Sequence, residues 1–151
     1  MGRTMEACSL DDLPGVRVTP LRRIAHPQGD VLHGLKASDP AFCGFGEAYF
    51  STIHAGAIKG WKKHRRMTLN LMVPVGTIRF VVADDRDSRV QAAEITLGTD
   101  FYARLTVPPG LWLAFQGRGE SLNLLLNVAD LEHDPTEAVS VPLDHIPYPW
   151  S

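Results

Sequence analysis

Residues 67–84 read MTLNLMVPVGTIRFVVAD, and this stretch carries the clearest fold signal in the chain. Apolar and β-branched residues fill both halves, and Pro74-Val-Gly76 supplies turn chemistry between them. We interpret the stretch as the two strands of a β-hairpin with Gly76 in the turn. It therefore predicts a sheet, rather than a helix, at the centre of the fold.

Short segments of the same character extend this pattern along the chain. Their periodicity is two, or a short apolar run, rather than the 3.6 of a helix, and no internal repeat is present. The predicted strands are 17–22, 45–53, 57–63, 67–75, 77–84, 89–97, 102–107, 112–116 and 121–128. Strands at this spacing indicate an all-β sandwich, jelly roll or small barrel. A helical turn or two is expected at 10–13 and at 129–137.

Length and composition indicate one domain. The chain has 151 residues, 44% of them apolar and 21% charged, and its 13 glycines and 11 prolines suit a fold with many turns. We expect a single domain over 1–151, with an N-terminal arm at 1–16 and a C-terminal tail at 129–151. Because the tail ends in Tyr148 and Trp150, we expect it to pack on the domain or on a dimer partner.

The charge balance argues against nucleic acid and anionic membranes as default partners. Lys and Arg number 15 against 17 Asp and Glu, a formal net charge of −2. The two cysteines are too few for a disulfide scaffold, and the start lacks the pattern of a signal peptide. No apolar run approaches the roughly 18 residues of a membrane span. We therefore expect a soluble, cytoplasmic protein.

The densest polar stretch, KGWKKHRR at residues 59–66, lies on a predicted strand and its exit. Strand alternation puts Lys62, His64 and Arg66 on one face, and Lys59 joins them if the glycine beside it forms a bulge. Neighbouring cations favour a neutral imidazole that acts as a base, and they would also hold a diphosphate or stabilise an enolate oxygen. A solvated basic edge strand accounts for these residues equally well. An RNA-binding patch is a weaker reading, because a single aromatic residue is interleaved.

The same region has the register, but not the ligands, of the metal-binding pattern of cupins, which is His-x-His, a downstream glutamate, and a last histidine after Pro-x-Gly. Here the ligand positions hold Lys62, His64 and Leu69, and the last one falls on Leu113. One histidine among four ligand positions cannot hold Zn²⁺ or Fe²⁺. No nucleophile elbow, Walker loop or dinucleotide fingerprint is present either. We expect neither a metal nor another cofactor.

Several short motifs, taken in order, resemble the dTDP-4-dehydrorhamnose 3,5-epimerase family over residues 21–150, nearly the whole chain. They are Gly46-Glu-Ala-Tyr49, Ile58-Lys-Gly-Trp61, Val75-Gly76, Val107-Pro-Pro-Gly110 and Leu143-Asp144. The resemblance implies a cupin-type jelly roll (a double-stranded β-helix), usually a homodimer. It also implies metal-independent action on nucleotide-linked 4-keto-6-deoxy sugars.

The chemistry implied by the resemblance is proton transfer next to a carbonyl. A histidine oriented by an aspartate removes a proton from C3 or C5, a lysine stabilises the enolate, and a tyrosine returns a proton. Matched position by position, the base falls on Lys62, with His64 two residues later on the same face. The orienting aspartate falls on Asp144 and the family's arginine on Lys59. The other positions carry leucine: Leu69 for the lysine, Leu113 for a second histidine, and about Leu126 for the tyrosine.

From these residues and the resemblance we predict a metal-independent epimerase or isomerase of a nucleotide-linked 4-keto sugar, in surface-polysaccharide, lipopolysaccharide or deoxysugar biosynthesis. We expect His64 as the base, Lys62 as electrophile or second base, and Asp144 as the residue that holds the imidazole. Substrate contacts are expected from Lys59, Glu47, Tyr49, Arg66 and Asn127. The alternative is a module that binds a sugar nucleotide without turnover, with Leu69, Leu113 and Leu126 lining a drier pocket.

Overall fold

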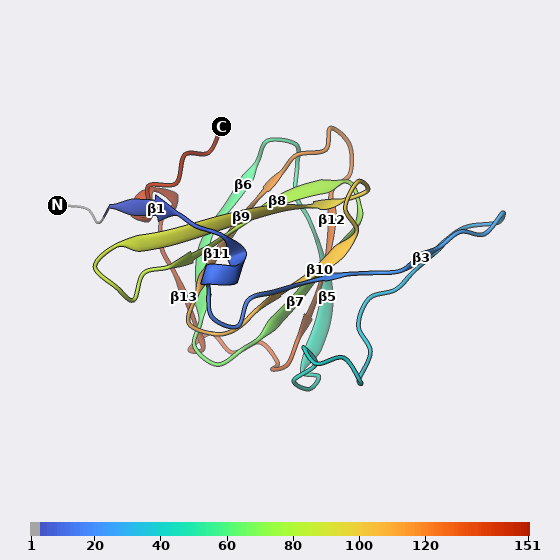
Figure 1. Ribbon diagram of the computed structural model, residues 1–151, viewed down its shortest axis with the longest axis horizontal. Helices are drawn as coiled ribbons and strands as arrows, with labels where there is room; N and C mark the ends of the chain where they lie inside the picture. Colours follow the sequence, from blue (N-terminus) through green and yellow to red (C-terminus); the bar gives the residue numbers. More distant parts are fainter. Residues whose placement is uncertain (1–3) are drawn as a thin grey trace.

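The computed structural model describes residues 4–151, and its strands form two facing sheets and one small ribbon (Figure 1). In spatial order, the first sheet holds β1 (Met5–Ala7), β9 (Val90–Gly98), β8 (Thr77–Asp84), β11 (Trp112–Gly117), β6 (Ile58–His64) and β13 (Ala138–Ser140). The second holds β2 (Arg17–Pro20), β10 (Ala103–Val107), β7 (Leu69–Val75), β12 (Leu124–Ala129) and β5 (Glu47–Thr52). The predicted all-β jelly roll is confirmed.

The remaining elements are small. β3 (Arg23–Ile24) and β4 (Val31–Leu32) pair as a separate ribbon. Between residues 4 and 151, helix is limited to the 3₁₀ turns η1 (Leu10–Asp12) and η2 (Leu143–His145). No helix within residues 4–151 has the length and apolar character needed to cross a membrane. Residues 1–3 of the expected N-terminal arm lie outside the described part of the chain.

Strand alternation explains how the two sheets enclose a core. On β8, Ile78, Phe80 and Val82 are buried in the cluster between the sheets. Val81 and Ala83 point the other way and are also buried, in a second cluster on the outer face of the first sheet. Burial on both faces is why this strand reads as a continuous apolar run rather than as an alternating one.

The nine predicted strands are all present, with ends that differ by up to three residues. The short strands β1, β3, β4 and β13 were not predicted, because two or three residues carry no readable periodicity. A helical turn does form as η1 at 10–12, but the helix expected at 129–137 is wrong. β12 extends to Ala129, and turns follow it up to Glu137.

The hairpin predicted at 67–84 is also wrong, although both of its strands exist. β7 and β8 belong to different sheets, so the chain turns a corner at Gly76 and crosses from one sheet to the other. Gly76 has φ +83°, and a Cβ there would lie 2.4 Å from the carbonyl oxygen of Leu122. The Asn123 side chain accepts a hydrogen bond from the Thr77 N–H at 2.9 Å and fixes the corner. A turn motif specifies the reversal but not which sheet the second strand joins.

The C-terminal segment covers the outer face of the first sheet. The Trp61 indole N–H donates to the Leu143 carbonyl at 3.0 Å, and the Trp150 ring lies 6.0 Å from the Trp61 ring. Tyr148 donates its hydroxyl proton to Glu94 on β9. The aromatic end of the chain is therefore packed on its own domain, behind the strand that carries residues 58–64.

Candidate active site

A cavity of about 280 Å³ opens between the two sheets. β5, β6, β7, β11 and β12 all contribute side chains to it, so the jelly roll itself shapes the site. Its lining residues are Tyr49, Ser51, Lys59, Gly60, Lys62, His64, Leu69, Leu71, Leu113, Phe115, Leu125 and Asn127. Polar groups from β5, β6 and β12 thus face a wall of leucines, the combination typical of a small-molecule site.

His64, at the end of β6, is held by a buried carboxylate. Its Nδ1 lies 2.6 Å from Oε1 of Glu137, a residue only 2% exposed. The other carboxylate oxygen accepts hydrogen bonds from the backbone N–H groups of Arg66 at 2.8 Å and Met67 at 2.9 Å. Both carboxylate oxygens of Glu137 are thereby hydrogen-bonded, and the contact to Nδ1 orients the imidazole.

Glu137 keeps its charge despite its burial. Burial alone raises the pKa of the carboxyl group, but the hydrogen bonds from His64 and from the two backbone N–H groups outweigh it, and the pKa lies below its ordinary value. A carboxylate only accepts hydrogen bonds, so Nδ1 of His64 carries the proton that it donates to Glu137. In the neutral form of the ring this tautomer leaves Nε2 unprotonated, which is the arrangement of an imidazole acting as a base.

Two lysines of β6 face the cavity together because the strand is irregular. Leu113 on β11 is paired with Lys62, whereas Phe115, two residues on, is paired with Lys59, three residues back. The extra residue on β6 is a bulge, which is the condition under which the sequence placed Lys59 on the same face as Lys62, and both lysines line the cavity. Lys59 donates to the Thr52 carbonyl at 2.9 Å. Lys62 has no hydrogen-bond or ion-pair partner within residues 4–151 and is free to meet a ligand oxygen.

Tyr49 and Asn127 form a polar pair on the second sheet. The Asn127 amide donates to the Tyr49 hydroxyl oxygen at 2.8 Å. Because that oxygen is already an acceptor, its own proton is available to a ligand. The carbonyl oxygen of Asn127 is buried and has no partner among the described residues. The pair adds a hydroxyl donor to the cavity opposite the β6 cations.

Three residues predicted for the site lie elsewhere. Asp144 is exposed on η2 and lines a groove of the C-terminal segment, and the carboxylate that contacts the His64 imidazole is that of Glu137. Glu47 accepts a hydrogen bond from the backbone of His133. Arg66 follows the end of β6, where alternation no longer applies, and its guanidinium lies 3.7 Å from Asp134 with 67% of the side chain exposed.

The leucine wall is partly as predicted. Leu69 and Leu113 line the cavity, but Leu126 does not. The alternation of β12 points Leu125 and Asn127 inward and sends Leu126 to the opposite face of the sheet, where it pairs with Phe50. Within residues 4–151, no three His, Cys, Asp or Glu side chains gather in a group that could hold a metal ion.

Sequence reasoning missed Glu137. It follows a proline in a turn, 73 residues after His64, and nothing in its neighbourhood marks it as an active-site acid. The signal is the pairing of β13 with β6, in which Ala138 lies opposite His64. A three-residue strand is too short to be recognised before the fold is known.

The fold of this chain is similar to those of several solved nucleotide-sugar enzymes. The dTDP sugar isomerase from Desulfovibrio desulfuricans G20 is 37% identical, with a TM-score of 0.86 and 91% of each chain covered. The sugar 3,4-ketoisomerase QdtA from Thermoanaerobacterium thermosaccharolyticum, solved with TDP, is 18% identical, with a TM-score of 0.72 over 89% of this chain and 93% of that one.

The dTDP-4-dehydrorhamnose 3,5-epimerase from Sulfolobus tokodaii is 17% identical, with a TM-score of 0.77 over 90% of this chain and 82% of that one. These two more distant likenesses show the shared fold. Neither the protein-family models nor the curated protein sequences give a match. On the strength of the 37% identical relative, the chain belongs to the family of dTDP sugar isomerases and dTDP-4-dehydrorhamnose 3,5-epimerases.

Proposed function

We propose that this protein is a metal-independent isomerase that shifts the carbonyl group of a nucleotide-linked 4-keto-6-deoxy sugar between neighbouring carbons. The observation that carries the proposal is the His64–Glu137 pair, in which a buried carboxylate orients an imidazole that lines the cavity beside an unpaired Lys62. Proton abstraction next to a carbonyl needs a base of this kind and a positive charge to meet the enolate oxygen.

The reaction would use these groups in a simple order. Nε2 of His64 takes the proton from C3, and the electron pair moves to the C4 carbonyl oxygen, where the Lys62 ammonium or the Tyr49 hydroxyl stabilises it. The proton on the C3 hydroxyl passes to the C4 oxygen by way of the enediol. His64 then returns its proton to C4, which leaves a 3-keto sugar with nothing gained or lost. One electrostatic contact of this type contributes about 3–4 kcal/mol to lowering the barrier.

The presence of a single imidazole, that of His64, among the cavity residues within 4–151 favours this isomerisation over a double 3,5-epimerisation. Inversion at a carbon requires a base on one face of the sugar and an acid on the other, and double inversion repeats this at a second carbon. Across from His64 the described lining offers Leu69, Leu71 and Leu125 together with the Tyr49 hydroxyl, and His64 is its one imidazole. Moving one proton between adjacent carbons on one face needs a single imidazole.

The cations of the cavity support a nucleotide-linked substrate. Lys59 and Lys62 are exposed at the cavity, where a diphosphate would gain charge-assisted hydrogen bonds. The 37% identical relative is a dTDP sugar isomerase, which favours a dTDP-linked sugar. A cytoplasmic role in deoxysugar supply for surface polysaccharide, lipopolysaccharide included, is consistent with such a substrate and with the free thiols of Cys8 and Cys43.

A homodimer is part of the proposal. The sequence suggested it through the aromatic C-terminal tail, whereas the structure supports it through the β3–β4 ribbon. The aromatic tail packs on the first sheet of its own chain. The β3–β4 ribbon, in contrast, extends away from both sheets (Figure 1). It exposes Ile24 and Val31, and a two-stranded ribbon alone in water is marginally stable. A second copy of the chain is the natural surface for it to pack on.

Solvent deuterium tests the function directly. With TDP-4-keto-6-deoxyglucose in D₂O, we expect deuterium at C4 of a 3-keto product and, by reversal, at C3 of the substrate, followed by NMR. His64→Asn should slow this by about 10²–10⁴-fold. His54→Asn, which changes an exposed histidine outside the cavity, should not.

The position of the deuterium distinguishes an isomerase from an epimerase and from a binding module. Deuterium at C3 and C5 with inversion would replace isomerisation by epimerisation. Tight binding of the nucleotide sugar without exchange at any carbon would make the protein a binding module.

A further inference from the structure

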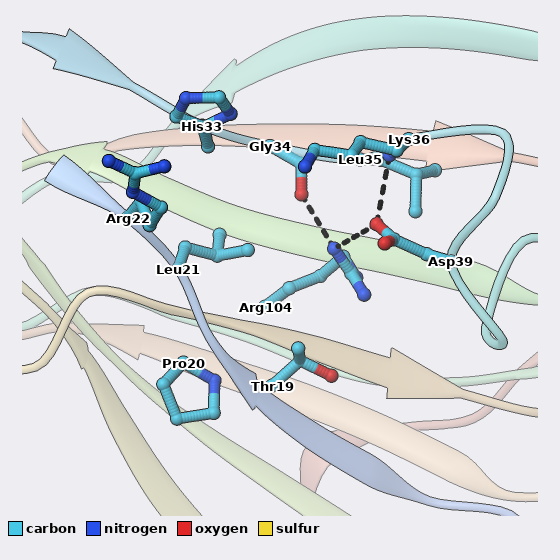
Figure 2. A pocket seen from close by; sticks show the side chains of 10 residues that line it. All are labelled: Thr19, Pro20, Leu21, Arg22, His33, Gly34, Leu35, Lys36, Asp39 and Arg104. Atoms are coloured by element: carbon cyan, nitrogen blue, oxygen red, sulfur yellow. Dashed lines mark hydrogen bonds and ion pairs between the residues drawn. The ribbon is translucent and has the colours of Figure 1, made fainter. Parts of the chain in front are cut away.

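A second pocket, of about 160 Å³, lies at the base of the β3–β4 ribbon (Figure 2). Its walls come from Thr19–Arg22, where the chain leaves the sheet, and from His33–Lys36 and Asp39, where it returns. Arg104 of β10 lies between them on the outer face of the second sheet. Its neighbour Leu105 points into the core, so this pocket and the cavity at His64 are on opposite faces of that sheet.

Arg104 is buried without enough acceptors. The residue is 1% exposed, and both of its recorded hydrogen bonds use Nη1, to the Gly34 carbonyl at 2.6 Å and to Asp39 Oδ2 at 3.2 Å (Figure 2). Nε is buried and has no partner among residues 4–151. A guanidinium has five N–H donors, and leaving some of them unpaired in the interior is unfavourable. The geometry calls for a further acceptor.

The rest of the pocket offers cations rather than that acceptor. Arg22 and Lys36 line it from the two sides of the ribbon base, and Asp39 is the one acid among its lining residues in the described chain. Asp39 is already engaged by Arg104 and by the Lys36 backbone N–H at 2.9 Å. Counting Arg22, Lys36 and Arg104 against Asp39 leaves a positive pocket. An anion would satisfy both the free donors and the charge.

We propose that this pocket binds a phosphate-type oxyanion, held by Arg104 at the floor and by Arg22 and Lys36 at the rim. Its volume of about 160 Å³ is little more than half the 280 Å³ of the cavity at His64, so it suits a phosphoryl group better than a complete sugar nucleotide. The anion would join the outgoing and returning chains of the ribbon to the sheet. It would thereby fix the direction in which the ribbon projects.

Inorganic phosphate is the probe for the test, added to the full chain at constant ionic strength with chloride as the reference anion. We expect saturable shifts of the amide NMR signals of Gly34, Lys36 and Arg104. The exposed residues Arg22 and Lys36 can be changed with little risk to folding, so the variant is Arg22→Ala with Lys36→Ala. It should bind phosphate at least ten-fold more weakly. Arg89→Ala, an exposed arginine paired with Glu6 on the other sheet, is the matched control and should bind normally.

The outcomes also identify the source of the anion. If TDP shifts the same three signals at lower concentration than phosphate, the ligand is the diphosphate of a nucleotide. If TDP acts only on cavity residues such as Tyr49, the ligand is free phosphate. Shifts that rise linearly without saturation, or that are the same in the double variant, would overturn the site. None of these readouts depends on turnover. The phosphate site and the proposed isomerase activity are therefore tested independently of each other.

Discussion

The Glu137 carboxylate holds the His64 imidazole at 2.6 Å although the two residues are 73 positions apart. The contact exists because β13 pairs with β6, with Ala138 opposite His64 and Ser140 opposite Lys62. Glu137 is the last residue before β13, and its backbone carbonyl also accepts a hydrogen bond from the Arg65 N–H at 2.8 Å. The orientation of the proposed base is therefore set by strand pairing, not by a mobile loop.

Glu137→Gln should impair catalysis and stability together. The amide retains the shape but removes the charge that favours the imidazolium formed after proton abstraction, so we expect kcat to fall by about 10²-fold or more with KM little changed. Losing hydrogen bonds to a buried charged group costs about 1.5–3 kcal/mol. Deuterium exchange on the 4-keto sugar nucleotide and urea unfolding measure the two effects.

Asp144→Asn is the informative comparison. Asp144 is exposed on η2, so we expect near-normal exchange and stability. If Asp144→Asn abolished exchange and Glu137→Gln did not, the aspartate suggested by the family resemblance would be the orienting group after all.

Acid should weaken the fold through the same carboxylate. The pKa of Glu137 in the folded protein lies below its ordinary value of 4.5, because the hydrogen bonds from His64 and two backbone N–H groups outweigh the opposing effect of burial. A lowered carboxyl pKa contributes stability above the unfolded value and loses it as the pH falls through the folded value. We expect the stability difference between wild type and Glu137→Gln to be full at pH 7 and to shrink below pH 4.5.

The difference between the two proteins, rather than the wild-type curve alone, is the quantity to measure. Asp84 and Asp134 also have lowered pKa values, through hydrogen bonds from Arg86 and Thr136, and they add to acid sensitivity in both proteins. Urea unfolding of the pair at pH 7, 4.5 and 3 isolates Glu137. A constant difference across this range would contradict its assignment.

The sequence was sufficient for the strands but not for their assignment to sheets. β8 was predicted at 77–84 with its observed bounds, because a long run of β-branched and apolar residues ends at Asp84. The corner at Gly76 was taken for a hairpin, since tight turns of both kinds need a residue with positive φ. What distinguishes them is the set of contacts that each strand finds across the core.

The candidate site was predictable where it lies on one strand. Lys59, Lys62 and His64 follow from alternation and one bulge on β6, and all three line the cavity. Arg66, just after the strand ends, is not among the residues that line the cavity. Glu137 was not predicted at all, because its place beside His64 depends on a long-range strand pairing. Local periodicity reaches neighbours on the same strand, whereas an acid from a distant turn enters only through the tertiary fold.

Lys62→Gln should distinguish a role in the chemistry from a role in binding. If the ammonium stabilises the enolate oxygen, we expect kcat to fall by about 10²-fold with KM little changed, because the charge matters most in the transition state. Lys59→Gln, whose amine is held by the Thr52 carbonyl, should instead raise KM for the nucleotide sugar. Steady-state kinetics of both variants provide the test. A rise in KM alone for Lys62→Gln would reduce that residue to a substrate contact.

Alkali should release the C-terminal segment through Tyr148. Burial and the hydrogen bond donated to Glu94 raise the pKa of Tyr148 from an ordinary 10 to about 12. A raised tyrosine pKa contributes stability that is fully present below the unfolded value and is lost as the pH rises toward the folded one. Between about pH 10 and 12 we therefore expect the segment to loosen, and the fluorescence of Trp150, whose ring is 4.9 Å from that of Tyr148, to change.

Tyr148→Phe supplies the comparison for this prediction. It keeps the ring packing but removes the ionisable group, so the alkaline fluorescence transition should be lost and the ultraviolet tyrosinate titration should lose its component near pH 12. Tyr102→Phe removes another tyrosine with a raised pKa, caused by burial near the ribbon, and should leave the Trp150 signal unchanged. An unaltered transition in Tyr148→Phe would mean that the segment is released by a different group, with Glu94 and Arg79 as the next to change.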